Sequence, residues 1–168
     1  GTSAGNFMQR ELAIAMGLNA GFSDQGARSI AIGIAAGKLG QGEYSIGIGT
    51  DAGFTGQGVN SVAIGSGAGY SGQGVNSVAI GPAAGNSNQG ASSVAIGSNA
   101  GTFNQKSETI CLGHDVNIPS GLTSASISLG LRALAVSGTV DSSFIGFTGT
   151  GGQFGFTGSG DSPATLIT

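Results

Sequence analysis

The sequence predicts an all-β protein, a parallel β-solenoid with 16-residue coils. Small residues recur at every sixteenth position from Gly17 to Gly113, which is typical of a stacked repeat architecture. Large apolar residues alternate with small ones in short segments, as in a β-strand. Glycine supplies 35 of the 168 residues and charged residues only 8%, but 39% of the residues are hydrophobic. This balance favours an ordered fold of small residues over a disordered linker.

The repeat is clearest in the ten residues GQGVNSVAIG, which occur from Gly56 and again from Gly72. We use "column" for the set of residues that occupy the same place in successive repeats. The last glycine of the motif defines one column: Gly17, Gly33, Gly49, Gly65, Gly81, Gly97 and Gly113. A glutamine column keeps the same spacing: Gln9, Gln25, Gln41, Gln57, Gln73, Gln89 and Gln105. Stacking of the coils is therefore expected to turn the glutamines into a ladder with amide-to-amide hydrogen bonds along the axis.

Each repeat predicts two short extended segments. The first precedes the motif's last glycine, as in Val62–Ile64, where two β-branched residues flank an alanine. The second is expected near Tyr70 and Ser71, after a glycine-rich corner, with Gln73 and Gly74 turning the chain back. Helical repeats are excluded because glycine recurs about every fourth residue and each one costs a helix about 1 kcal/mol relative to alanine.

The alternation within the first strand predicts two unlike faces. We expect the large aliphatic residues to be buried as the core and the small face to be flat, uncharged and available for close packing between chains. The residues predicted to make the contact of an oligomer are Ser61, Ala63, Ser77, Ala79, Ser93 and Ala95. The alternative is a serine-rich face that is simply solvated.

The motif also resembles a known family. NSVAIG at Asn60–Gly65 and Asn76–Gly81, with SSVAIG at Ser92–Gly97, is similar to the head repeat of trimeric autotransporter adhesins of the YadA type. The resemblance covers about residues 1–113 and implies a left-handed parallel β-roll, three of which pack around a common axis, in a head that binds host surfaces or matrix. The family's repeat is usually shorter than the repeat of this chain, and similar longer repeats occur in phage tail fibres and large-virus surface proteins.

The columns divide the chain into three parts. Residues 1–113 form the predicted β-roll, and residues 114–137 form a transition with one imperfect coil. In that coil Ile127 and Leu129 match the aliphatic columns after a displacement of one residue. Residues 138–168, with FIGFTG and FGFTG segments, are expected to form a small C-terminal β cap or a connector.

No segment predicts catalysis or a cofactor. Cys111, His114 and Asp115 form the one cluster with metal-ligand chemistry, but the sequence offers no further cysteine or histidine to complete a site. Gly65–Gly69 lacks the strand-to-helix setting of a phosphate-binding loop. Five basic residues and a net charge of −3 argue against nucleic-acid binding. The apolar run 30–37 is too short to span a bilayer, so membrane insertion is not expected.

These observations predict a non-enzymatic structural or attachment module. The resemblance implies a homotrimer in an extracellular fibre on a virion or microbial cell surface, with a virion or phage tail fibre favoured over a bacterial adhesin head. The partner would be a host-surface glycan or protein. Phe22, Phe54 and Tyr70 share one column and are candidate receptor contacts, or alternatively shield a thin core at a corner. An ice-binding solenoid and a left-handed β-helix acyltransferase are the further alternatives.

Overall fold

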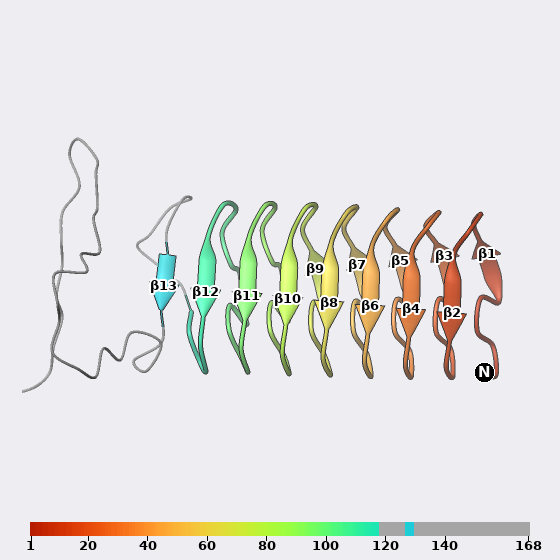
Figure 1. Ribbon diagram of the computed structural model, residues 1–168, viewed down its shortest axis with the longest axis horizontal. Coiled ribbons are helices and arrows are strands. Elements are labelled where there is room, and N and C mark those ends of the chain that lie inside the picture. The colour runs from red at the N-terminus through yellow and green to blue at the C-terminus, as the bar shows by residue number, and fades with distance from the viewer. Residues whose placement is uncertain (118–126, 130–168) are drawn as a thin grey trace, which may run out of the picture. The chain divides into compact units, whose positions relative to one another are not determined.

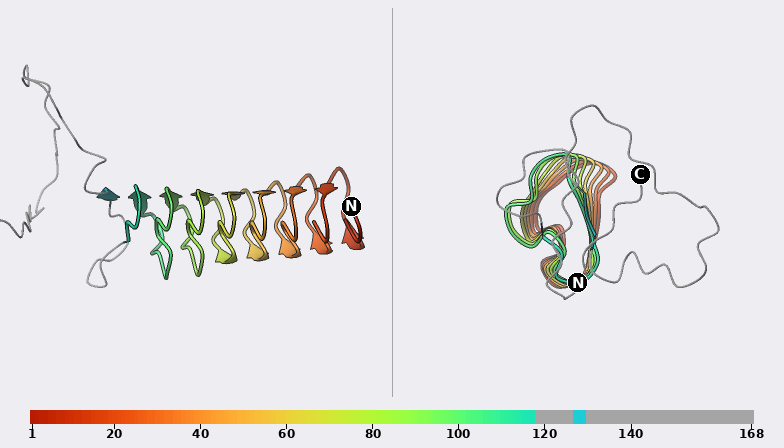
Figure 2. Two further views of the ribbon diagram at one scale, coloured as in Figure 1. Left: turned by 90° about the horizontal axis from the view of Figure 1, so that it is seen from below. Right: turned by 90° about the vertical axis from the view of Figure 1, so that its left-hand side faces the viewer.

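The computed structural model describes residues 1–117 and 127–129, and in these residues the chain is a parallel β-solenoid without a helix. Figures 1 and 2 show successive coils stacked along one axis, so the predicted all-β solenoid with 16-residue coils is confirmed. The handedness and the homotrimer stay predictions, and the proposed cap at 138–168 lies outside the described residues.

The described solenoid has two parallel sheets, and every strand has three residues. The larger sheet extends along all of its coils, whereas the smaller sheet ends at Gln73 and continues only as isolated bridges at Ser87 and Phe103. The larger sheet contains β2 (Ile14–Met16), β4 (Ile30–Ile32), β6 (Ile46–Ile48), β8 (Val62–Ile64), β10 (Val78–Ile80), β11 (Val94–Ile96), β12 (Ile110–Leu112) and β13 (Ile127–Leu129). The smaller sheet contains β1 (Phe7–Gln9), β3 (Ser23–Gln25), β5 (Leu39–Gln41), β7 (Thr55–Gln57) and β9 (Ser71–Gln73). These five strands each end at a glutamine and the turn follows later, so the expectation that Gln73 turns the chain was wrong.

The register of the larger sheet follows the sequence columns. Val62 lies opposite Val78, and Ala63 lies opposite Ala79. The last pair differs, because the partner of Ile110 is Ile127, one position further along the chain than the repeat would place it. Outside the strands, main-chain hydrogen bonds of about 2.8–3.0 Å also join each coil to the next, as from the Gly69 N–H to the Ala84 carbonyl. The backbone polar groups are thereby paired between coils.

The interior of the coil is filled by small and amide side chains. Alanine, serine and glutamine columns lie inside and are almost completely inaccessible, as in Ala63 at 0%, Ser61 at 0% and Gln57 at 3% exposure. Each buried glutamine of the column crosses the interior: Gln57 Nε2 donates to the Ile46 carbonyl at 2.7 Å, and Gln73 Nε2 to the Val62 carbonyl at 2.8 Å. The predicted amide-to-amide ladder is therefore wrong, because these amides brace one sheet against the other.

The large aliphatic residues lie outside the coil. Ile64 and Ile96 are 36% and 39% exposed, whereas Ala63 and Ala95 between the aliphatic columns are fully buried. The expectation of an aliphatic core with a small-residue exterior was wrong, and the two faces are reversed. The physical reason is the narrow interior of the coil. A single glutamine side chain spans it from one sheet to the other, so the remaining space admits only alanine, serine and similar small side chains.

Candidate interaction surfaces

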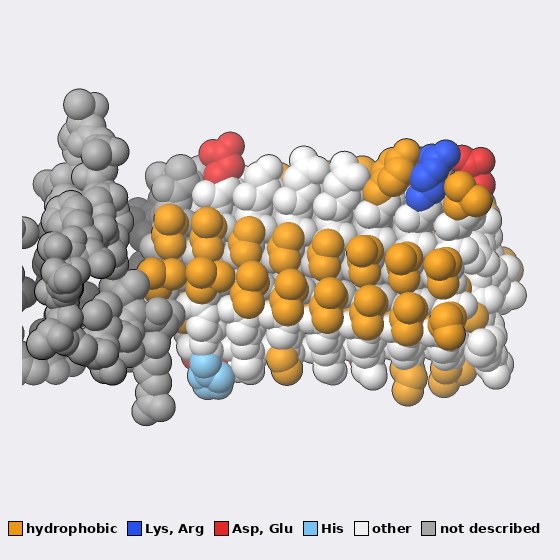
Figure 3. Space-filling model, in the orientation of Figure 1, with side chains coloured by type: hydrophobic (Ala, Val, Ile, Leu, Met, Phe, Trp, Pro, Cys, Tyr) orange, Lys and Arg blue, Asp and Glu red, His pale blue; other side chains and the backbone are white. Residues whose placement is uncertain are grey.

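The outward side of the larger sheet carries two parallel ranks of aliphatic side chains, which we call the aliphatic face. Its first rank is Ile14, Ile30, Ile46, Val62, Val78, Val94, Ile110 and Ile127. Its second rank is Met16, Ile32, Ile48, Ile64, Ile80, Ile96, Leu112 and Leu129. Figure 3 shows the two ranks running along the rod, bordered on both sides by a surface that is mostly white, the colour of the backbone and of uncharged polar side chains. A contiguous apolar surface of this kind marks an interaction site.

The residues predicted to form the oligomer contact do not reach this surface. Ser61, Ala63, Ser77, Ala79, Ser93 and Ala95 are each 0% exposed within a single chain. The serines are occupied locally: Ser61 Oγ donates to the Gly58 carbonyl at 2.7 Å, and Ser77 Oγ to the Gly74 carbonyl at 2.6 Å. The contact assignment is therefore corrected, because side chains enclosed by their own coil cannot pack against another chain. The sequence feature that could have indicated the enclosed face is the glutamine column, because buried glutamines need hydrogen-bond partners inside the coil.

The candidate receptor residues lie along the side of the rod that leads into the smaller sheet. Phe54 and Tyr70 stack face to face, with ring centroids 4.9 Å apart and an angle of 9° between the planes. Lys38 Nζ lies 5.0 Å from the centroid of the Phe54 ring. Phe22 is separate from this stack and makes an edge-to-face contact with Phe7 at 5.2 Å. The structure thus brings two of the three residues together, and the stacking of their rings adds a side-chain contact between two successive coils.

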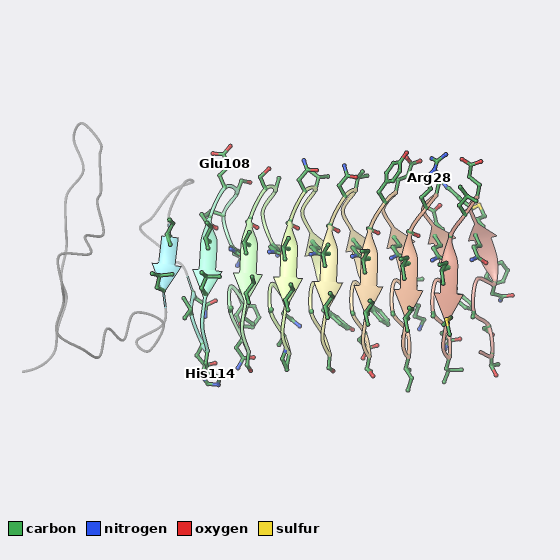
Figure 4. All side chains as sticks on the ribbon, viewed as in Figure 1. Arg28, Glu108 and His114 are labelled. Atoms are coloured by element: carbon green, nitrogen blue, oxygen red, sulfur yellow. The ribbon has the colours of Figure 1, made fainter. Side chains whose placement is uncertain are left out.

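A charged corner in the first three coils was not predicted from the sequence. Arg10 Nη2 lies 3.0 Å from Asp24 Oδ1, and its Nη1 lies 3.8 Å from Glu43 Oε1. Arg28 Nη2 lies 3.2 Å from Glu11 Oε1, and the Arg28 guanidinium also packs over the Tyr44 ring at 5.5 Å. Figure 3 shows acidic and basic side chains next to each other at one edge of the rod beside the N-terminal coils, where Figure 4 labels Arg28. The sequence feature that could have indicated this corner is that these charged residues stand in columns where later repeats have glycine, valine or asparagine.

The structure separates the residues of the Cys111, His114 and Asp115 cluster. Cys111 is fully buried in the alanine column, whereas the His114 and Asp115 side chains are 73% and 58% exposed at an outer corner. His114 Nδ1 lies 2.8 Å from Asp115 Oδ2, and Asp115 Oδ1 accepts a 2.8 Å hydrogen bond from Asn99 Nδ2. Over residues 1–117 and 127–129, no group of three metal-ligating side chains comes together. A search of the same residues finds no helix of the length and hydropathy needed to cross a membrane.

Comparison with known proteins adds no relative to this picture. The chain matches no protein-family model, and no curated protein or solved structure is significantly similar to it. The interaction surfaces therefore have to be interpreted from their own chemistry.

Proposed function

We propose that the chain is a non-enzymatic structural and attachment module, one subunit of a homotrimeric surface fibre whose subunits pack through the aliphatic face. The observation that supports this proposal most directly is the position of the large aliphatic residues. They are the main apolar material of the repeats, and the coil leaves them outside.

The energetics favour covering this face. Most of these side chains keep about a third or less of their surface exposed, and burying that remainder is worth about 0.5–1 kcal/mol each. Over the sixteen side chains of the two ranks this amounts to roughly 8–16 kcal/mol per chain. Association costs about 4–15 kcal/mol in lost translational and rotational freedom. Covering the whole face therefore offsets a cost of that size.

The shape of the face favours an identical chain as the partner. Each coil presents the same pair of aliphatic side chains at the same spacing, so a second copy with its coils at equal height meets like residues throughout. Neither rank contains a charged residue, and no like-charge repulsion opposes this arrangement. Three copies, as the resemblance to trimeric adhesin heads implies, would bring their aliphatic faces toward a shared axis. The same resemblance supports an extracellular site on a virion, a phage tail fibre or, alternatively, a bacterial surface.

Light scattering of the purified chain tests the assembly. We expect a mass of about three times 16.1 kDa. The double variant Ile64→Glu, Ile80→Glu should dissociate into folded monomers, because it places unpaired charges in the apolar contact. Ser66→Glu is the matched control, since Ser66 is exposed outside both ranks, and this variant should keep the native mass. A monomeric native chain, or a double variant that keeps its mass, would refute the proposed interface and leave the aliphatic ranks open to other roles, ice binding among them.

A further inference from the structure

The charged corner borders an open hollow of about 340 Å³. The charged side chains of Arg10, Asp24 and Glu43 line it, together with Val59, the buried Gln41 and the glycines Gly26, Gly40 and Gly42. The hollow is open because Gly40 has no side chain, and no atom lies within 4 Å of the place where a Cβ would stand. Its volume is at the lower end of the range for small-molecule sites.

The repeat itself provides an internal comparison for this hollow. Two coils further along, the places of Asp24 and Glu43 are taken by Gly56 and Val75, and Arg10 is replaced by Gly42 in its own column. The scaffold therefore folds without these charges. Asp24 also adopts a left-handed conformation, with φ of 53°, in a column that is elsewhere mostly glycine or asparagine. Departures from a repeat that folds well without them are expected at functional positions.

The charges in the hollow restrict the chemistry of a ligand. Two carboxylates face the space and would repel an anion. The Arg10 guanidinium lies 3.0 Å from Asp24 and 3.8 Å from Glu43, where a bound cation would otherwise sit. A neutral ligand with several hydroxyl groups fits best, because it can donate to free carboxylate lone pairs and accept from free guanidinium N–H groups.

From this arrangement we infer that the hollow binds a single neutral sugar residue, such as the terminal hexose of a glycan. Asp24 and Glu43 accept hydrogen bonds from sugar hydroxyls, Arg10 donates to a hydroxyl or ring oxygen, and Val59, which is 40% exposed, contacts the apolar side of the sugar ring. The inference rests on the proposed attachment function and deepens it by giving the class of its ligand. The hollow belongs to one chain and lies outside the aliphatic face.

Saturation-transfer NMR on the full chain tests the site with three probes, the methyl glycosides of mannose, galactose and N-acetylglucosamine. We expect transfer to at least one of them. The double variant Asp24→Asn, Glu43→Gln should weaken that binding by about tenfold or more, as expected when charged hydrogen-bond partners are lost. Both replacements keep the size of the side chain, and asparagine tolerates the left-handed conformation of residue 24.

Glu108→Gln is the matched control, because Figure 4 places Glu108 on the same corner as Arg28 but near β12, at the other end of the described rod. This variant should bind the glycosides like the native chain. The absence of transfer to all three glycosides would overturn the site, and so would undiminished binding in the double variant. Binding of methylammonium in place of the glycosides would overturn the ligand class. The mass of the native chain is measured in parallel. A monomeric mass would refute the proposed fibre, whereas the glycoside experiment separately tests the sugar site in the hollow.

Discussion

Replacing Gly69 with alanine should destabilise the solenoid far more than the same change at Gly67, although both glycines have positive φ. Gly69 has φ of 53° and Gly67 has φ of 65°. A Cβ on Gly69 would lie 2.6 Å from Gln73 Oε1 and 2.8 Å from Gln73 Cδ. A Cβ on Gly67 would meet only Asn86 Nδ2, at an ordinary contact distance of 3.5 Å. Comparing the two variants therefore separates the cost of backbone strain from the cost of a collision with the glutamine brace, by which we mean the hydrogen bond that each buried glutamine makes across the coil.

The magnitude follows from two contributions. An alanine in the left-handed region costs about 1–2 kcal/mol at either position. At Gly69 the added methyl group also displaces Gln73, whose Nε2 donates to the Val62 carbonyl at 2.8 Å inside the coil. Leaving these buried groups unpaired costs about 1–3 kcal/mol more. We expect a loss of about 2–5 kcal/mol for Gly69→Ala and about 1–2 kcal/mol for Gly67→Ala.

Urea unfolding at fixed protein concentration, followed by circular dichroism, measures the difference. A double-mutant cycle with Gln73→Ser isolates the collision, because the shorter side chain no longer occupies the place of the new methyl group. The two single changes should then be less than additive by about 1 kcal/mol or more. Equal losses at Gly67 and Gly69, or strict additivity with Gln73→Ser, would refute the idea that the glycine column is required by the glutamine column.

Two further substitutions test the reversed faces and the aromatic stack. Ala63→Glu should abolish the circular dichroism signal of the folded protein, because it buries an unpaired charge in a fully enclosed position. Ile64→Glu should instead leave a folded monomer. A folded Ala63→Glu monomer would contradict the buried position of residue 63. Phe54→Ala should lower the free energy of unfolding by about 1–3 kcal/mol, since it removes the stack on Tyr70 and the contact with Lys38, and an unchanged urea midpoint would show that these contacts add nothing.

The fold was predictable because its signals are local and repeated. The spacing of the glycines gave the coil length, and the alternation at Val62–Ile64 gave the strand and its register with Val78–Ile80. The orientation of the faces was not predictable from that alternation, because a three-residue strand shows that its two sides differ without showing which one is enclosed. The choice depends on the volume inside the coil, which Gln57 fills by spanning from one sheet to the other.

The interaction surfaces were harder to predict for a different reason. The aromatic column was visible as a departure from the repeat, but only the structure shows that Phe54 stacks on Tyr70 while Phe22 turns to Phe7. The charged corner combines Arg10 from one coil with Asp24 and Glu43 from the next two. In the sequence these residues look like isolated substitutions, and their proximity appears only when the coils are stacked.

The glutamine brace also determines how such a rod can change in length. Each brace is local in the chain, as from Gln73 back to Val62, and the main-chain bonds reach only the neighbouring coils. A 16-residue cassette can therefore be removed or duplicated without altering the contacts of distant coils, and each event changes the length by about 4.8 Å. The near-identical copies that begin at Gly56 and Gly72 have the form that duplication of one cassette would leave. The number of repeats then acts as a molecular ruler, which sets the length of the rod while its cross-section stays constant.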